Sequence, residues 1–187
     1  MSCRTIVWEV SGADDRRVAF ERLFAVHYWA VRGYVLRRSP GAAIEDVVAD
    51  TFLVAWRRLE SVGDDPLPWL LGVARRMLAN QQRTERRRGA LMARLQSVIP
   101  RQSVGWEAPA EMSTPLAAAI GSLSAREREA LLLVAWEGLE PGRAARAAGC
   151  TPAAFRVRLH RARRHVADRL AATADIHRPP PIAEKAP

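Results

Sequence analysis

The clearest chemistry in this sequence is a set of guanidinium groups in the stretch from Pro141 to Leu170, most of them on its second predicted helix. Thr151 and Pro152 favour a helix start, because a hydroxyl can cap free N–H groups and proline fits the first turn. At about 100° per residue, one side of that helix carries Arg156, Val157, His160, Arg161 and Arg164. Arginine side chains on such a face can bind guanine edges and phosphates.

The other side of the same helix is apolar. Its stripe recurs at steps of three and four, at Phe155, Leu159, Ala162, Val166 and Leu170. A short helix-forming run precedes it and is broken at Gly149 and Cys150. Two helices, a tight turn with glycine and an arginine-rich outer face predict a helix-turn-helix whose second helix enters the major groove. A basic helix that faces solvent and packs on a neighbour is the alternative interpretation.

A second informative helix is predicted over residues 42–59. Its core side repeats at helical spacing, at Ile44, Val47, Val48, Thr51, Phe52, Ala55 and Leu59. Its outer side carries Asp46, Ala49, Asp50, Leu53 and Arg57. A leucine among carboxylates on an outer face indicates a protein contact, although an ordinary exposed leucine would look the same.

Residues 61–68 (SVGDDPLP) are predicted to form a loop, because Gly63, Pro66 and Pro68 disfavour a helix through them. Trp69 is then predicted to open a third helix that runs into the arginines of residues 83–88. An aromatic ring can stack on unpaired bases while arginines bind phosphates. A core tryptophan beside a solvated basic helix end is the equal alternative.

The remaining elements follow from periodicity and caps. A first helix is predicted over residues 17–38, with His27 at the core or its boundary, and residues 90–114 are predicted to be a linker. Ser124 and Glu127 form a capping-box pattern at the start of another helix. We therefore predict an all-α protein of two small helical domains joined by a flexible linker. Its segments are an extension (1–16), a first domain (17–89), the linker, a second domain (115–172) and a disordered Pro-rich tail (173–187).

Composition supports nucleic acid as one partner. The formal net charge is +9 and the sequence pI is about 11.1, and Lys185 is the one lysine among 29 basic residues. Residues 75–101 are strongly basic, whereas residues 45–65 are acidic, so we expect two different partners. No apolar run reaches the roughly 18 residues of a membrane span, and the two cysteines have no zinc spacing. We expect a cytoplasmic protein without membrane insertion, cofactor, metal site or catalytic residues, and not an enzyme.

The two halves together resemble an extracytoplasmic-function sigma factor. The run IEDVVADTFLVAWRRL, the loop, and PWLLGVARRMLANQQRTERRR resemble sigma region 2. The run LAAAIGSLSAREREALLLVAWEGL and a helix-turn-helix ending VRLHRARRHV resemble region 4. The resemblance implies a subunit of RNA polymerase that reads the minus-ten element with region 2 and the minus-thirty-five element with region 4. It implies core polymerase and promoter DNA as partners, and it allows an anti-sigma factor.

The resemblance also assigns site residues by position. The polymerase-docking helix is matched at Asp46, Ala49, Asp50, Leu53 and Trp56. The minus-ten surface is matched at Ser61, Val62, Gly63, Asp64, Trp69, Arg75, Arg76 and Arg83. The minus-thirty-five surface is matched at Arg156, Val157, His160, Arg161 and Arg164.

Several positions depart from the family pattern. Gly72 stands where the family often has arginine, Arg76 where it often has asparagine, and Val157 where a small polar residue is common. Two other functions fit parts of the sequence. A stand-alone helix-turn-helix regulator leaves the acidic helix with Leu53 unexplained. A sigma-like mimic that only sequesters a protein predicts no basic outer face at residues 156–164, and the sequence has one.

Overall fold

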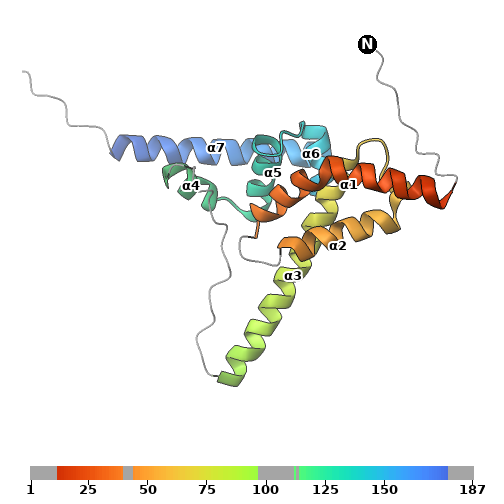
Figure 1. Ribbon diagram of the computed structural model, residues 1–187. Coiled ribbons are helices and arrows are strands. Elements are labelled where there is room, and N and C mark those ends of the chain that lie inside the picture. The colour runs from red at the N-terminus through yellow and green to blue at the C-terminus, as the bar shows by residue number, and fades with distance from the viewer. Residues whose placement is uncertain (1–11, 40–43, 97–111, 113, 177–187) are drawn as a thin grey trace, which may run out of the picture.

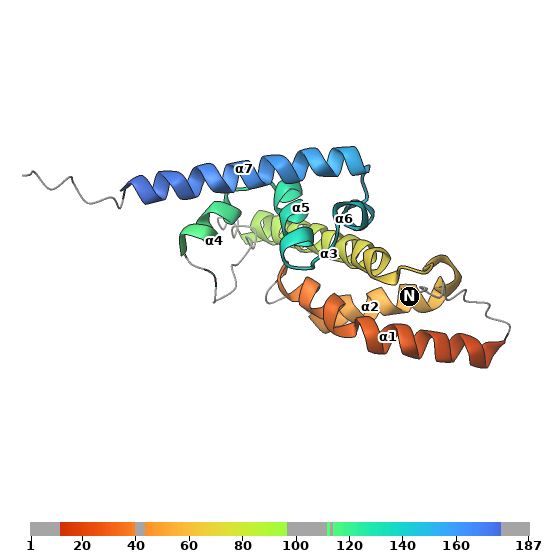
Figure 2. The ribbon, with the colours of Figure 1, turned by 90° about the horizontal axis from the view of Figure 1, so that it is seen from above.

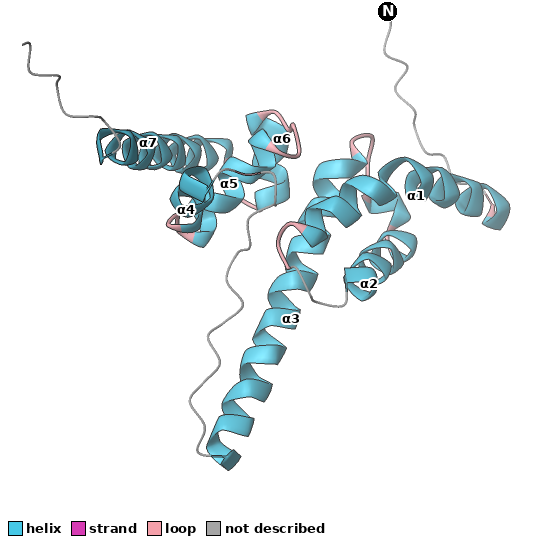
Figure 3. Ribbon diagram, turned by 60° about the vertical axis from the view of Figure 1, so that its left-hand side comes forward, coloured by secondary structure: helices cyan, strands magenta, loops and turns pink. Residues whose placement is uncertain are grey.

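The computed structural model describes residues 12–39, 44–96, 112 and 114–176, and helices are the regular structure it contains there (Figures 1 and 3). The N-terminal half consists of α1 (Ala13–Leu36), α2 (Ile44–Arg57), a short 3₁₀ turn (Leu59–Ser61) and α3 (Pro66–Gln96). The C-terminal half consists of α4 (Thr114–Gly121), α5 (Ala125–Ala135), α6 (Pro141–Ala148) and α7 (Pro152–Ile176). The all-α prediction is confirmed.

The predicted caps of the C-terminal half are present. The Ser124 side chain accepts a hydrogen bond from the backbone N–H of Glu127, and the Glu127 carboxylate accepts one from the backbone N–H of Ser124. Thr151 Oγ1 accepts a hydrogen bond from the N–H of Ala154 at 3.2 Å, so it caps α7. Gly149 ends α6 with a φ of +63°, a left-handed conformation that glycine adopts without strain. These caps fix the turn between α6 and α7.

Two predictions about α3 are wrong. The helix begins at Pro66 rather than Trp69, so the loop before it is shorter than expected. Pro66 and Pro68 lie in the first turn of the helix. Backbone N–H groups in a first turn have no acceptor within the helix, so the N–H that proline lacks is not missed there. The helix also continues to Gln96, through Gly89 and into the predicted linker. Helix α7 likewise continues to Ile176, so the first residues of the predicted disordered tail (173–187) are helical instead. The rest of the linker, residues 97–111 and 113, and the rest of the tail, residues 177–187, lie outside the described residues.

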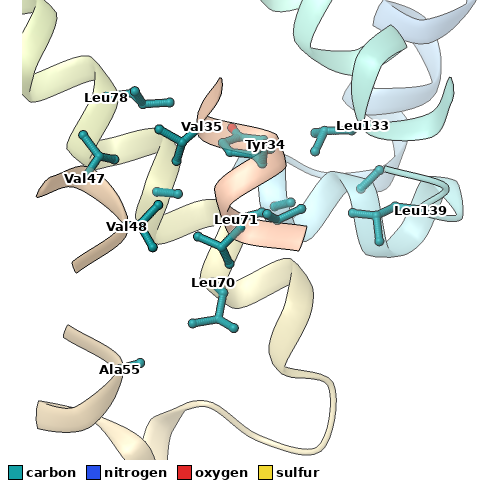
Figure 4. Packing of buried hydrophobic residues seen from close by; sticks show 14 of the residues in the cluster. Tyr34, Val35, Val47, Val48, Ala55, Leu70, Leu71, Leu78, Leu133 and Leu139 are labelled. Atoms are coloured by element: carbon teal, nitrogen blue, oxygen red, sulfur yellow. The ribbon is translucent and has the colours of Figure 1, made fainter. Parts of the chain in front are cut away.

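The two halves share one hydrophobic core. Buried side chains of α1, α2 and α3 belong to the same cluster as Leu133 of α5, Leu139, and Phe155 of α7. Tyr34 and Leu71 of the N-terminal half belong to this one cluster with Leu133 and Leu139 of the C-terminal half (Figure 4). A smaller cluster, built on Ile120, Leu123 and Ala162, joins α4 to α7. Viewed from above, α6 and α5 lie between α7 and the first three helices (Figure 2).

Candidate nucleic-acid and protein interfaces

The outer face of α2 is exposed as the periodicity predicted. Five residues on its other side are buried in the core: Val47, Val48, Thr51, Phe52 and Ala55. Asp46, Ala49 and Asp50 are exposed, and Leu53 beside them is 44% exposed. A leucine with two carboxylates therefore faces solvent on a helix whose opposite side is fully used by the core. This acidic face with a central leucine can bind a basic protein surface that has an apolar pocket.

Trp56 lies at the edge of that face and not within it. Its ring packs edge-on against Phe20 of α1 with a centroid distance of 5.2 Å. The guanidinium of Arg16 lies 5.3 Å from the centre of the same ring, and Arg16 Nη2 donates a hydrogen bond to the Trp56 carbonyl at 2.7 Å. Trp56 thus joins α2 to the start of α1 and is only half-buried, so one part of it remains accessible.

The residues predicted to hold a minus-ten base divide into two groups. Ser61, Gly63 and Asp64 are exposed at the end of the 3₁₀ turn and in the loop before α3. Val62 is buried with 6% of its surface accessible, so its side chain anchors the loop to the core. The exposed side chains of the loop are therefore held on a fixed base, as a binding loop requires.

The predicted minus-ten residues of α3 also divide. Trp69 is half-buried and packs against the core cluster, whereas Arg76 and Arg83 are exposed. Arg75 contacts the C-terminal half instead, because its Nε donates a hydrogen bond to the carbonyl of Ala147 at 3.3 Å. This placement agrees with Trp69 being a core residue, and it leaves Arg76 and Arg83 accessible for binding nucleic acid.

The predicted minus-thirty-five residues lie together on α7. All five are exposed: Arg156, Val157, His160, Arg161 and Arg164. Phe155, Leu159 and Ala162 on the opposite side are buried. Val157 is 51% exposed in the middle of the basic face, where an apolar group can contact a thymine methyl. The two-sided prediction for this helix is confirmed: one side is buried, and the other is exposed and basic.

Ion pairs hold the helix-turn-helix against the N-terminal half. Asp65, in the loop before α3, accepts hydrogen bonds from Nε and Nη2 of Arg143 at 2.9 and 2.6 Å. Arg146 Nη2 donates to the same carboxylate. Both arginines belong to α6, so the first helix of the motif lies on the loop that the sequence assigned to base recognition. The paired arginines hold the pKa of Asp65 below its usual range, mainly through the hydrogen bond from Arg143.

A buried network, which the sequence analysis missed, joins the end of α1 to α5 and the turn after it. Arg38 donates from Nε to Glu129 at 2.7 Å and from Nη1 to Glu137 at 2.9 Å. Tyr34 donates its hydroxyl hydrogen to Glu129 at 2.8 Å. The side chains of Arg38 and Glu137 are only 10% and 5% exposed. Burial, and then the nearby charge of Glu129, raise the pKa of the Tyr34 hydroxyl well above its usual value.

Two glycines allow close approach of α3 to α6. A Cβ atom at Gly72 would lie 3.4 Å from the carbonyl oxygen of Ala147, and Gly72 is buried. A Cβ atom at Gly149 would lie 2.8 Å from Nη2 of Arg75. The glycine at 72, one of the departures from the family pattern, thus occupies a contact between the two halves where a long side chain has no room.

The described parts of the chain contain neither a cluster of metal-binding side chains nor a membrane-spanning helix. There, no group of three His, Cys, Asp or Glu side chains is arranged to hold a metal ion. A search of the same residues for a helix long and apolar enough to span a bilayer found none.

Known protein families match both halves in the predicted order. The family model for Sigma-70 region 2 matches residues 23–88, and the model for Sigma-70 region 4 matches residues 113–166. The ECF RNA polymerase sigma factor SigL of Mycobacterium tuberculosis is 35% identical over 157 residues, covering 81% of this chain and 89% of SigL. The RNA polymerase sigma factor CarQ of Myxococcus xanthus is 31% identical over 153 residues, covering 80% of this chain and 86% of CarQ.

Among the solved structures similar to this chain over both halves are two complexes of sigma factors. One is the sigma factor RpoE of Bartonella quintana in complex with the anti-sigma factor NepR, with 26% identity, coverage of 81% of this chain and 96% of that one, and a TM-score of 0.62. The other is CnrH in complex with the cytosolic domain of CnrY, with 26% identity, coverage of 83% and 90%, and a TM-score of 0.57. With both sigma regions matched in order and its relatives aligned over most of their length, the chain belongs to the extracytoplasmic-function sigma factors of bacterial RNA polymerase.

Proposed function

We propose that the outer face of α2 docks this sigma factor on core RNA polymerase. The exposed Leu53, with Asp46, Ala49 and Asp50 around it, is the observation that supports this most directly. A stand-alone DNA-binding regulator has no use for an acidic face with a central leucine. Trp56 would contribute at the edge of the face, through the part of its ring that Phe20 leaves accessible.

Promoter recognition is assigned to two further surfaces. The loop residues Ser61, Gly63 and Asp64, with Arg76 and Arg83 of α3, would hold the minus-ten element, and Val62, Trp69 and Arg75 would support them. The outer face of α7 would read the minus-thirty-five element through its five exposed residues. Basic residues contribute affinity through phosphates at both surfaces, whereas base edges decide specificity.

The closed arrangement of the two halves bears on this function. The loop residue Asp65 is paired with α6, and Arg75 is bonded to the end of α6, so the helix-turn-helix lies against the proposed minus-ten surface. Reading two separated promoter elements would require these contacts to break. We propose that the described arrangement is a resting form that opens on polymerase.

An anti-sigma protein is proposed as a further partner, because the matched structures of RpoE and CnrH are complexes with NepR and the cytosolic domain of CnrY. The cytoplasm is the proposed location, since core polymerase and promoter DNA are there. We assign no catalytic step to this chain: its proposed contribution is binding and positioning for the polymerase.

Reconstituted transcription tests the proposed function. The full chain is added to core polymerase with a library of genomic fragments, and the 5′ ends of the transcripts are sequenced. Transcripts should start a fixed distance downstream of one shared pair of sequence elements, and only when the chain is present. Tight, sequence-specific DNA binding by the chain without polymerase, together with unchanged start sites, would instead support a stand-alone regulator.

A further inference from the structure

A cavity of about 670 Å³ lies between the two halves of the molecule. One wall is α3, with Arg75, Leu78, Gln82 and Arg86, and the opposite wall comes from α5 and the start of α7. Tyr34 and Arg38, at the end of α1, and Ala148 and Gly149, at the end of α6, also line it. Because both halves contribute, this cavity exists only in the closed arrangement.

The side chains that line the cavity are mainly positively charged. Among the described residues, six arginines and a single acid, Glu129, line the cavity, and that carboxylate already accepts hydrogen bonds from Tyr34 and Arg38. Nη2 of Arg38 is buried and has no hydrogen-bond partner in the part of the chain that the structure describes. The cavity therefore holds an excess of positive charge that the described protein groups do not neutralise.

Three of these arginines are free to bind a ligand. Within the described part of the chain, Arg86 of α3, Arg126 of α5 and Arg158 of α7 form no ion pair or hydrogen bond through their side chains, and none belongs to the proposed polymerase or promoter surfaces. The other arginines have structural partners: Arg75 binds the carbonyl of Ala147, and Arg128 binds carbonyls at the end of α4.

The shape and chemistry define the class of ligand. Guanidinium groups bind phosphate oxygens in pairs, so three of them from three helices suit several linked phosphates better than one carboxylate. Leu78, Ala79 and Leu132 add an apolar part to the lining that a nucleotide base can cover. The volume falls within the range of small-molecule sites and is far too small for duplex DNA.

We propose that this cavity binds a small molecule with two or more linked phosphates, and that its binding holds the two halves of the sigma factor closed. The phosphates would lie against Arg86, Arg126 and Arg158. A ligand that binds only the closed form, present at about one hundred times its Kd, shifts the balance between closed and open forms about one hundredfold toward closure.

Isothermal titration of the full chain with ATP and with inorganic tripolyphosphate tests the site without needing polymerase. We expect saturable binding of one molecule per chain. Arg126→Gln and Arg158→Gln should each weaken it by about tenfold or more, through loss of a charge-assisted hydrogen bond. Arg163→Gln is the matched control, because Arg163 is exposed on α7 and does not line the cavity. Tighter binding of ATP would show that the base contributes, and equal binding would show that the phosphate chain alone is recognised.

The requirement for closure is tested with Gly72→Arg. Gly72 does not line the cavity, but an arginine there should separate α6 from α3. Its added positive charge would strengthen any nonspecific attraction to polyphosphate, so a loss of affinity in this variant, with its helix content unchanged by circular dichroism, reports loss of the site. Equal weakening by Arg126→Gln and Arg163→Gln, binding of many ligands per chain, or undiminished affinity in Gly72→Arg would each overturn the proposal. Since the readout is direct binding, its failure leaves the transcription experiment unaffected.

Discussion

Asp65 and Arg143, 78 residues apart in the chain, form a bidentate ion pair between the loop before α3 and the first helix of the helix-turn-helix. Arg146 adds a second cation to the same carboxylate. The pair connects the two surfaces that we assign to different promoter elements. Its strength therefore helps to decide how readily the protein opens.

Asp65→Asn should favour the open form. The amide cannot replace the ionic part of the contact, and a pair of this partial exposure contributes about 1 kcal/mol. We expect a larger radius of gyration by small-angle X-ray scattering and faster cleavage of the segment between α3 and α4 by protease. Asp64→Asn is the matched control, because Asp64 is the exposed neighbouring residue. If the two variants behave alike, the ion pair does not hold the halves together.

The same pair predicts a pH dependence. The pKa of Asp65 is lowered in the folded protein, chiefly by the hydrogen bond from Arg143. Its contribution to closure is therefore complete above the usual pKa of an aspartate, about 4, and is lost as the pH falls through the lowered value. Scattering between pH 3 and pH 6 should show opening at the acidic end, with a smaller pH effect in Asp65→Asn. An identical pH profile in that variant would assign the change to other carboxylates.

Gly72→Arg should open the protein more strongly than Asp65→Asn. Gly72 is buried against Ala147, where even a Cβ atom would lie at 3.4 Å from the carbonyl oxygen. Gly72→Ala fits at that distance and serves as the control, with the added advantage that alanine favours the helix. Scattering should report expansion for the arginine variant alone, while circular dichroism shows the same helix content in both. Expansion with loss of helix would indicate disruption of α3 itself.

The sequence predicted what depends on neighbouring positions in the chain. The two faces of α7, the capping box at Ser124 and the exposed Leu53 follow from helical periodicity and local hydrogen bonding, and all are present. The start of α3 was misjudged because prolines were treated as helix breakers, although the first turn accepts them.

Contacts between distant segments could not be predicted in this way. Tyr34 and Glu129 are 95 residues apart, and nothing in their local sequence marks them as partners. Arg37 and Arg38 follow the end of a helix, a position where basic residues are common whether or not they have a partner elsewhere. Their pairing with Glu129 and Glu137 depends on how the two halves pack, which one-dimensional periodicity does not encode.

Leu53→Asp should abolish binding to core polymerase. If polymerase covers Leu53, its burial contributes about 1.5–3 kcal/mol, and an aspartate there would be buried without a partner. Co-purification with tagged core polymerase measures the loss. Val18→Asp is the matched control, because Val18 is 48% exposed on α1 and lies outside the proposed docking face. Wild-type binding by Leu53→Asp would remove the docking assignment, and a loss of helix content would show that Leu53 supports the fold.

Arg161→Ala should weaken recognition of the minus-thirty-five element. Arg161 is exposed on the outer face of α7, between His160 and the buried Ala162. If its guanidinium binds a base edge, the substitution costs about 1–3 kcal/mol on the preferred promoter and relaxes selectivity at one or two base pairs. Transcription from a library randomised at the minus-thirty-five element separates this from a phosphate contact, which would weaken all sequences equally. Arg163→Ala, an equal change of charge on an exposed residue of the same helix, should leave the selectivity unchanged.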